Sequence, residues 1–291
     1  MSWWRGFEAI VRPEVPLGPH TWYKLGGPAA WLCEPRNPPE LAALLARLRD
    51  AGVLWRVLGC GANVLVSDEG WRGAVIHLAG DFARVELTHT VTAAAGADFP
   101  RLIRRTIRSG LVGLEVLAGI PGSVGGLIRM NAGGKYGEVG QFVRDVTLLD
   151  RHGNLVERTA AEVGFRYRHT DLDGCIVLAA RFALARGDAE AALRRHRAIW
   201  QEKYASQPPV SERSAGCIFK NPAGHSAGRL LDQAGLKGVR VGGAEISARH
   251  ANFIVAHEGA TAGHVIDLIR LAQDRVWNTS GIKLELEIDI W

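Results

Sequence analysis

The most informative part of this sequence for its fold is the stretch Gly113–Gly137, GLEVLAGIPGSVGGLIRMNAGGKYG. Glycine fills about a third of it, far above the average usage of ~7%. Because glycine loses more backbone freedom on folding than any other residue, such a cluster is expected where the backbone takes φ > 0 or approaches another group closely. The stretch therefore predicts a loop that either holds a ligand or makes tight turns between packed strands.

The order of residues in this stretch favours a ligand. A turn at Ile120–Gly122 precedes Ser123, which is a good N-cap residue, and Val124–Met130 is predicted to form a short helix. The N–H groups of Gly122–Gly126 would then point outward and offer a site for an anion. On this basis a phosphate-containing ligand is slightly favoured over plain turns.

Two other phosphate-binding motifs do not fit this loop. The glycines follow a G-x-x-G-x-x-G spacing from Gly119, which differs from the G-x-G-x-x-G of a Rossmann dinucleotide site. The pair Gly134-Lys135 is followed by Tyr136, whereas a P-loop needs Ser or Thr at that position to bind magnesium.

A second glycine loop lies upstream and also follows a predicted buried strand. Val53–Leu58 is an apolar run, and it is followed by Gly59-Cys60-Gly61-Ala62-Asn63 and a further apolar segment, Val64–Val66. Asn63 could cap the chain or hydrogen bond to a ligand. Two such loops, separated by about fifty residues, could hold the two ends of one pyrophosphate.

The rest of the chain predicts an α+β fold, because strands, hairpins and helices are mixed without regular βα alternation. Helices are expected at 38–51, 98–110, 189–204, 226–234 and 260–277, and strands at 30–33, 74–78, 85–92, 146–150, 155–158, 175–183 and 251–255. The closing KLELEIDIW alternates strictly between apolar and charged residues, which predicts a final strand. Gly187-Asp188 is a predicted domain boundary.

Composition is that of an ordinary globular protein, with 47% hydrophobic and 22% charged residues over 291 positions, enough for two or three compact units. No apolar run approaches the ~20 residues of a membrane span and the N-terminus does not predict a secretory signal, so we expect a cytoplasmic protein without a membrane partner. The net charge of +5 lacks a dense basic run, so it fits a small polyanion and does not indicate nucleic acid. The four cysteines are scattered, which predicts neither a metal site nor a disulfide framework.

Six motifs together resemble those of the UDP-N-acetylenolpyruvoylglucosamine reductase family. In chain order they are GCGANVLV, GIPGSVGGLIRMNAGGKYG, FRYRHT, SAGCIFKNP, GGAEISARHANFIV and LELEI. Each motif is weak alone, but the set spans almost the whole chain in order and is highly specific. The short chain and simple C-terminus resemble the more compact class of the family.

The resemblance implies an α+β flavoprotein with a two-part FAD-binding domain of the vanillyl-alcohol-oxidase (PCMH) type, at 1–80 and 81–187, and a C-terminal α+β substrate domain at 188–291. It implies that NADPH reduces FAD, and that UDP-N-acetylglucosamine enolpyruvate becomes UDP-N-acetylmuramate for peptidoglycan synthesis, cell wall biogenesis, cell shape and cell division. Hydride is expected to go to C3 and a proton to C2 of the enolpyruvyl group. The expected partners are small molecules, and the expected state is a monomer.

Carried over residue by residue, the resemblance predicts three catalytic residues: Arg168, Cys217 and Glu287. It predicts substrate contacts at Tyr167, Asn221 and His250. The predicted cofactor-binding residues lie in the two glycine loops, and they are Gly59, Cys60, Gly61, Ala62, Asn63, Val64, Leu65, Gly122, Ser123, Val124, Gly125, Gly126, Asn131 and Ala132. Ala62 departs from the serine usual in the family, so one hydroxyl contact to the cofactor is missing.

The implied chemistry explains these residue types. Hydride addition at C3 pushes charge onto the carboxylate, and the planar guanidinium of Arg168 can bind a carboxylate through two hydrogen bonds. Cys217 stands where the family usually has serine, and a thiol with an ordinary pKa of ~8.5 is a stronger acid than an alcohol, so it can supply the proton. Without the resemblance, nothing favours Glu287 over Glu285 on the polar face of the final strand.

Two other functions stay open at this point. The chain could be a different flavoenzyme on the same scaffold, or a non-catalytic protein that binds nucleotides or nucleic acid through its positive charge. A purified protein without flavin absorbance would favour the second alternative, and flavin without NADPH consumption on the enolpyruvyl UDP-sugar would favour the first.

Overall fold

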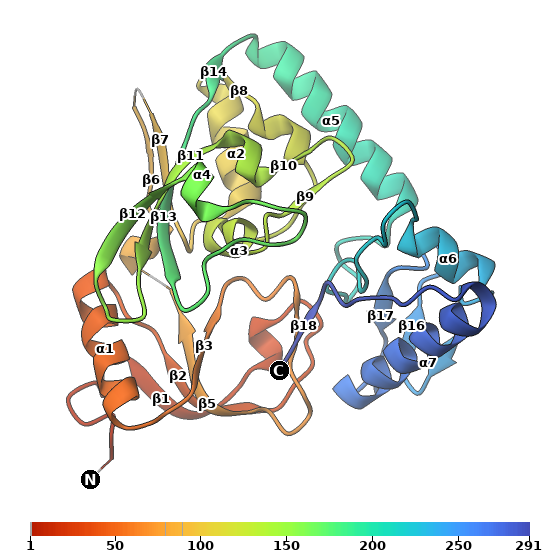
Figure 1. Cartoon of the computed structure of the whole chain (residues 1–291), viewed down its shortest axis with the longest axis horizontal. Helices are drawn as coiled ribbons and strands as arrows, with labels where there is room; N and C mark the ends of the chain where they lie inside the picture. The colour runs from red at the N-terminus through yellow and green to blue at the C-terminus, as the bar shows by residue number, and fades with distance from the viewer. Residues whose placement is uncertain (1, 79, 89) are drawn as a thin grey trace. The chain divides into compact units, whose positions relative to one another are not determined.

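The computed structural model describes residues 2–78, 80–88 and 90–291 and contains mixed helices and strands, in agreement with the predicted α+β class (Figure 1). The chain forms two compact units. Unit 1 consists of Met1–Pro13, Trp31–Cys60 and Gly73–Glu202, and unit 2 consists of Glu14–Ala30, Gly61–Arg72 and Lys203–Trp291. The functional division at residues 80 and 187 stays a prediction.

The first sheet leads into the first glycine loop. It has the strand order β1-β2-β5-β3, formed by β1 (Val11–Pro16), β2 (Pro28–Cys33), β5 (Trp71–His77) and β3 (Trp55–Leu58). Strands β3 and β5 pair in parallel, from Trp55 opposite Ala74 to Leu58 opposite His77. Because β3 ends at Leu58, the loop that starts at Gly59 leaves the sheet at the end of a strand.

Helix α1 (Pro38–Asp50) connects β2 to β3 and confirms the predicted helix. The side chain of Asn37 caps its N-terminus by accepting a hydrogen bond from the Glu40 N–H at 2.9 Å. Its leucines recur at helical spacing and are buried: Leu41, Leu44, Leu45 and Leu48.

The second sheet carries the second glycine loop. Its order is β12-β11-β13-β7-β6, and all its neighbours are antiparallel. The strands are β6 (Val85–Leu87), β7 (Val91–Ala94), β11 (Val143–Leu149), β12 (Leu155–Thr159) and β13 (Ile176–Phe182). The predicted hairpin is confirmed, with Leu149 opposite Leu155.

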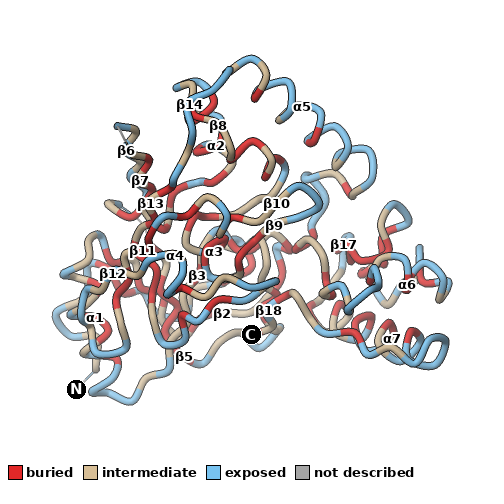
Figure 2. Tube along the Cα trace, turned by 45° about the horizontal axis from the view of Figure 1, so that its top comes forward, coloured by how far each residue is buried: buried red, intermediate tan, exposed pale blue. Residues whose placement is uncertain are grey.

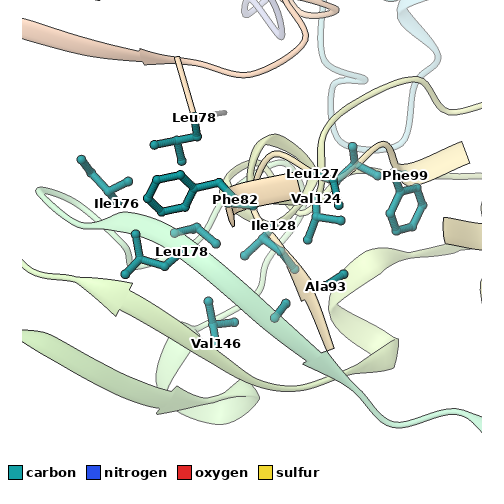
Figure 3. Close-up of a cluster of buried hydrophobic side chains, with 14 of the residues drawn as sticks. Leu78, Phe82, Ala93, Phe99, Val124, Leu127, Ile128, Val146, Ile176 and Leu178 are labelled. Atoms are coloured by element: carbon teal, nitrogen blue, oxygen red, sulfur yellow. The ribbon is translucent and has the colours of Figure 1, made fainter. Parts of the chain in front are cut away.

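Three helices share one buried core with this sheet. They are α2 (Phe99–Arg108), α3 (Val124–Arg129) and α4 (Ala160–Val163). The Asp98 carboxylate caps α2 by accepting from the Arg101 N–H at 2.6 Å. Apolar residues of α3, such as Val124, Leu127 and Ile128, join side chains of the sheet in one buried cluster (Figure 3). The start of α3 is therefore fixed by a well-packed core.

The remaining elements of unit 1 are short, apart from one long helix. They include β8 (Leu111–Val112), β9 (Gly133–Gly134), β10 (Gly137–Glu138), β14 (Ala185–Arg186), and α5 (Ala189–Ser206), whose last residues belong to unit 2. Strand β8 pairs with β14 and β9 with β10.

Unit 2 contains a small antiparallel sheet of order β15-β16-β17, formed by β15 (Arg240–Val241), β16 (Ala244–Ile246) and β17 (Ile254–Ala256). Helices α6 (Ala227–Gln233) and α7 (Ala262–Ser280) belong to the same unit and contribute to its core. Buried residues recur every three or four positions along α7, with exposed residues between them, as expected for an amphipathic helix (Figure 2). In the parts of the chain that the structure describes, no helix combines the length and hydrophobicity needed to cross a bilayer.

The predicted final strand is regular only over β18 (Asp289–Ile290), which pairs in parallel with β4 (Val64–Leu65). The predicted alternation is confirmed in part, because Leu284 and Ile288 are buried and Glu285 is exposed, whereas Leu286 and Glu287 are both half-buried. From 285 to 288 the backbone hydrogen bonds to loop residues and not to one neighbouring strand. These residues therefore do not form a regular strand. The Glu285 carbonyl accepts from the Lys220 N–H, for example, at 2.9 Å.

Candidate active site

The two glycine loops meet within unit 1 at Gly59 and Ser123. A Cβ atom at Gly59 would lie 2.4 Å from the Ser123 hydroxyl oxygen, so a side chain at position 59 would require this hydroxyl to move. Ser123 takes the N-cap position of α3, but its side chain makes no cap hydrogen bond. The predicted N-cap position and the short helix after it are confirmed, but Ser123 does not cap the helix through its side chain, and its hydroxyl faces the first loop.

The second loop offers fewer backbone N–H groups to an anion than its sequence suggested. The Val124 N–H donates to the Ala97 carbonyl at 3.0 Å, and the Gly125 N–H donates to the Ala95 carbonyl at 2.7 Å. These bonds hold the start of α3 against the connection between β7 and α2. Of the predicted group Gly122–Gly126, two N–H groups are thus used by the protein itself.

Asn131 is a structural support within the second loop. Its side chain is buried, with 1% of its surface exposed, and its backbone is left-handed at φ +44°. Its amide N–H groups donate to Glu138 Oε2 at 2.8 Å and to the Arg166 carbonyl at 2.9 Å, and its Oδ1 accepts from the Gly140 N–H at 3.0 Å. Both amide protons are therefore occupied, and the side chain joins the loop to the segment that carries Arg168.

Arg168 lies in a tight turn from Arg166 to His169. The two ends of the turn are joined by two backbone hydrogen bonds of 3.0 Å, one in each direction, and Arg168 takes φ +53°. Its Nη2 donates to the Gly133 carbonyl at 2.8 Å, and its guanidinium carbon lies 5.1 Å from the centre of the Tyr167 ring. The turn thus holds this guanidinium, beside an exposed tyrosine, against the second glycine loop.

In unit 2 the first glycine loop continues from Gly61 to Leu65 and is bound to the C-terminal segment. Asn63 Nδ2 donates to the Glu287 carbonyl at 3.0 Å, and the Asn63 carbonyl accepts from the Asp289 N–H at 3.1 Å. Val64 and Leu65 pair with Asp289 and Ile290. The loop predicted to bind the cofactor therefore fixes the backbone of the predicted catalytic glutamate.

Replacing Gly61 with alanine should destabilise the protein more than replacing Gly52. Both glycines are left-handed, at φ +68° and φ +65°, but a Cβ at Gly61 would lie 2.2 Å from the His20 carbonyl oxygen, whereas Gly52 has no atom within 4 Å of that position. Gly52→Ala should cost about 1–2 kcal/mol through backbone strain alone, and Gly61→Ala about 1–3 kcal/mol more. Thermal unfolding of both variants measures the difference, and equal shifts would contradict the close approach.

Cys217 and Glu287 belong to neighbouring segments of unit 2. The Ile218 carbonyl accepts a hydrogen bond from the Glu287 N–H at 2.8 Å, and Phe219 forms a β-bridge with Leu286. Both Cys217 and Glu287 are half-buried. Glu285 is different, because its side chain is 74% exposed and lies 3.7 Å from Lys220 Nζ. The structure therefore distinguishes two glutamates that the sequence could not.

The surroundings of His250 favour the neutral form of its imidazole. Burial lowers its pKa, and the Lys237 charge lowers it further. Its Nδ1 accepts from the Asn252 N–H at 3.2 Å, so Nε2 carries the proton of the neutral ring. The ring lies against Gly228, where a Cβ would come within 3.0 Å of Cε1. His250 can therefore donate a hydrogen bond to a polar ligand.

Asn221 contacts the start of α6. Its Oδ1 accepts from the Ala227 N–H at 2.9 Å. This bond orients the amide of Asn221 within the FKNP run, three residues after Ile218.

Sequence reasoning assigned no role to Asn252, which is 3% exposed. Its Oδ1 accepts from the Phe219 N–H at 2.9 Å and its Nδ2 donates to the Phe219 carbonyl at 2.8 Å. A polar residue inside the apolar run of ANFIV was the available signal, because a buried amide must find hydrogen-bond partners.

Family models match both parts of the chain. The model described as UDP-N-acetylenolpyruvoylglucosamine reductase, C-terminal domain, matches residues 207–291, and that of an FAD binding domain matches residues 29–159. These matches agree with the predicted fold of an FAD-binding domain followed by a C-terminal domain.

Relatives that match over almost their whole length belong to the same family. The UDP-N-acetylenolpyruvoylglucosamine reductase of Heliobacterium modesticaldum is 40% identical over 98% of this chain and 92% of its own length, and that of Anaeromyxobacter dehalogenans is 42% identical over 99% and 89%. The crystal structure of the Thermus caldophilus enzyme (MurB) superposes with a TM-score of 0.85 at 40% identity, covering 97% of this chain and 99% of that one. The predicted FAD-binding oxidoreductase is thereby confirmed, and the chain belongs to the UDP-N-acetylenolpyruvoylglucosamine reductase family.

Proposed function

We propose that this reductase uses NADPH to convert UDP-N-acetylglucosamine enolpyruvate into UDP-N-acetylmuramate, a peptidoglycan precursor. The membership of the family supports the reaction. The hydrogen bond from the Glu287 N–H to the Ile218 carbonyl supports the assignment of residues, because it brings the segments of the proton donor and of the acidic residue together. We further propose that the enzyme is a cytoplasmic monomer whose partners are small molecules, not nucleic acid or membranes.

The glycine loops fit an FAD cofactor. In unit 1 a Cβ at Gly59 would lie 2.4 Å from Ser123, and in unit 2 a Cβ at Gly61 would lie 2.2 Å from the His20 carbonyl. These contacts explain glycine at the two positions by close packing within the protein, and the peptide groups of such glycine loops can bind a pyrophosphate. We assign FAD binding to 59–65, 122–126 and 131–132, with Val124, Gly125 and Asn131 acting through packing rather than through the N–H groups already used. Bound FAD supplies the hydride carrier between NADPH and C3 of the substrate.

In this proposal Arg168 binds the enolpyruvyl carboxylate. Charge develops on this carboxylate when C3 receives hydride, and a fixed guanidinium stabilises it where it develops. The bond to the Gly133 carbonyl uses one N–H of Nη2 and holds the fork in place. A guanidinium carries five N–H donors in a planar fork, and this geometry matches that of a carboxylate.

Cys217 then donates its thiol proton to C2, which completes the addition of H⁻ and H⁺ across the double bond. Glu287 assists, as a neutral acid or through a water molecule, by hydrogen bonding to the developing enolate. Tyr167, Asn221 and His250 orient the substrate, and His250 does so through its Nε2–H. The Asn63 bond to the Glu287 carbonyl keeps the Glu287 backbone in place during these steps.

Glu287→Ala should slow the reaction with the enolpyruvyl substrate by about 10- to 100-fold, because a hydrogen bond to a developing charge contributes about 1.5–3 kcal/mol. Glu285→Ala is the matched control, since Glu285 is exposed and lies two residues away on the same segment. The rate of substrate reduction by Glu285→Ala should stay within about twofold of wild type. The measurement is single-turnover oxidation of the NADPH-reduced enzyme by substrate, and similar losses in the two variants would refute the role of Glu287.

The function as a whole is tested with purified protein supplied with FAD. We expect flavin absorbance, and NADPH consumption that depends on the enolpyruvyl UDP-sugar with formation of UDP-N-acetylmuramate. Flavin absorbance without this consumption would indicate a different flavoenzyme. Protein that binds nucleotides but no flavin would indicate a non-catalytic binder.

A further inference from the structure

The segment that carries Cys217 has an irregular pairing with the segment 252–256 of unit 2. The Ala256 N–H donates to the Arg213 carbonyl at 2.8 Å, and the Ile218 N–H donates to the Asn252 carbonyl at 2.9 Å. Regular antiparallel pairing from Arg213 would bring residue 217, not residue 218, opposite Asn252. One extra residue is therefore accommodated between 213 and 218, as in a β-bulge, and such irregularities redirect a side chain.

Gly216 allows this irregularity. It takes φ +77°, a conformation that L side chains rarely adopt, and it directly precedes Cys217. A glycine in a loop also brings conformational freedom, so a reactive side chain next to it needs other groups to fix its direction.

Tyr23 lies beside the chain before Cys217. Its side chain is completely buried and its hydroxyl donates to the Ile254 carbonyl at 3.1 Å. Ala215 belongs to the same buried cluster, and its N–H lowers the pKa of the Tyr23 phenol. Burial raises the pKa of this phenol well above its ordinary value, so the hydroxyl stays protonated and remains a donor. Tyr23 thereby holds Ile254, which lies between the two residues that bond to the Cys217 segment, Asn252 and Ala256, and it packs in the same cluster as Ala215.

Asn252 fixes the chain after Cys217. Its side chain bonds both to the N–H and to the carbonyl of Phe219, at 2.9 and 2.8 Å, and its own carbonyl accepts from the Ile218 N–H. Its N–H donates to His250 Nδ1 at 3.2 Å. One buried residue thus holds the chain just after the thiol and orients the imidazole that we assign to substrate binding.

We propose that Tyr23 and Asn252 are positioning residues for Cys217: Tyr23 holds Ile254 and packs with Ala215 before the thiol, Asn252 bonds to residues 218 and 219 after it, and together they clamp the thiol in the direction needed to protonate the substrate. The proposal rests on the proposed function, in which Cys217 is the proton donor. A displacement of about 1 Å at a reacting group can lower a rate by about 10²-fold, so loss of the clamp should affect proton donation selectively.

Tyr23→Phe tests the clamp, because it removes the hydroxyl and keeps the ring. We expect the reaction of the reduced enzyme with substrate to slow by about 10- to 100-fold, while reduction by NADPH stays within about twofold of wild type. Thr106→Val is the matched control, since Thr106 is buried in α2 of unit 1 and its hydroxyl donates to the Ile103 carbonyl at 2.9 Å. Thr106→Val should leave the ratio of the rates of the two half-reactions unchanged. Equal slowing of both half-reactions by Tyr23→Phe would show a merely structural role.

A double-mutant cycle with Cys217→Ala completes the test. If Tyr23 acts through the thiol, Tyr23→Phe should have no further effect, within about twofold, once Cys217 is alanine. An equal loss in both backgrounds would overturn the clamp. A wild-type rate for Cys217→Ala alone would refute the proposed proton donor, whereas a slow Cys217→Ala beside a fast Tyr23→Phe would refute only the positioning role. The same cycle with the isosteric Asn252→Asp, which replaces the donor facing the Phe219 carbonyl, decides the question if Tyr23→Phe does not fold.

Discussion

Cys217→Ala should slow reduction of the enolpyruvyl substrate by about 10²- to 10⁴-fold and leave oxidation of NADPH within about twofold of wild type. The reason is that only the substrate half-reaction needs a proton at C2, and a positioned acid contributes a factor of this size. The half-buried thiol, next to Gly216 and adjoining the Ile218 that bonds to Glu287, is the group we assign to this step. Stopped-flow measurement of each half-reaction separates the two rates.

Two variants control this experiment. Cys217→Ser should keep much of the activity, because a hydroxyl can also donate a proton from the same position. Cys175→Ala, at a half-buried cysteine of unit 1 to which we assign no catalytic role, should leave both half-reactions unchanged. If Cys217→Ala slowed both half-reactions equally, Cys217 would be a structural residue and the proposed proton donor would be wrong.

Arg168→Lys should lower kcat for the enolpyruvyl substrate by about 10²- to 10³-fold, although the positive charge is retained. Lysine has no planar fork, so it cannot bind a carboxylate through two parallel hydrogen bonds while it also bonds to a carbonyl such as that of Gly133. The position itself is demanding, because residue 168 takes φ +53° within a tight turn. Steady-state kcat and KM, together with the single-turnover rate, report the effect.

Arg166→Lys is the matched control for this variant. Arg166 lies in the same turn, but its guanidinium pairs with the Asp171 carboxylate and is exposed. The kcat of Arg166→Lys should stay within a few-fold of wild type. A rise in KM without a fall in kcat for Arg168→Lys would mean that Arg168 binds substrate and transition state equally, which would contradict its assigned role in stabilising developing charge.

The helices could be predicted well from the sequence because their signals are local. Asn37 and Asp98 cap α1 and α2 through side-chain bonds to the Glu40 and Arg101 N–H groups, and both residues directly precede a segment with helical apolar spacing. The hairpin of β11 and β12 likewise follows from two short strands and a turn. Elements whose partners lie within a few residues are specified by local sequence.

The candidate site could be predicted only in part. The glycine content of the two loops indicated a close approach, but it did not show that Gly59 faces Ser123 or that the N–H groups of Val124 and Gly125 are already bonded. Asn131 was assigned to the cofactor from its motif, whereas its amide protons bond to Glu138 and Arg166. Hydrogen-bond partners at these distances along the chain cannot be derived from local patterns.

The sequence by itself determined the family, the α+β class, most helices and the residue types needed for the chemistry, because motifs and periodicity are properties of neighbouring residues. Tertiary structure alone decided which buried polar groups satisfy one another. It paired Tyr23 with Ile254 and Asn252 with the Cys217 segment, and it placed Glu287, rather than Glu285, half-buried beside Ile218. The physical reason is that a buried polar group must be paired, and its partner is whichever group the packed chain brings within hydrogen-bonding distance.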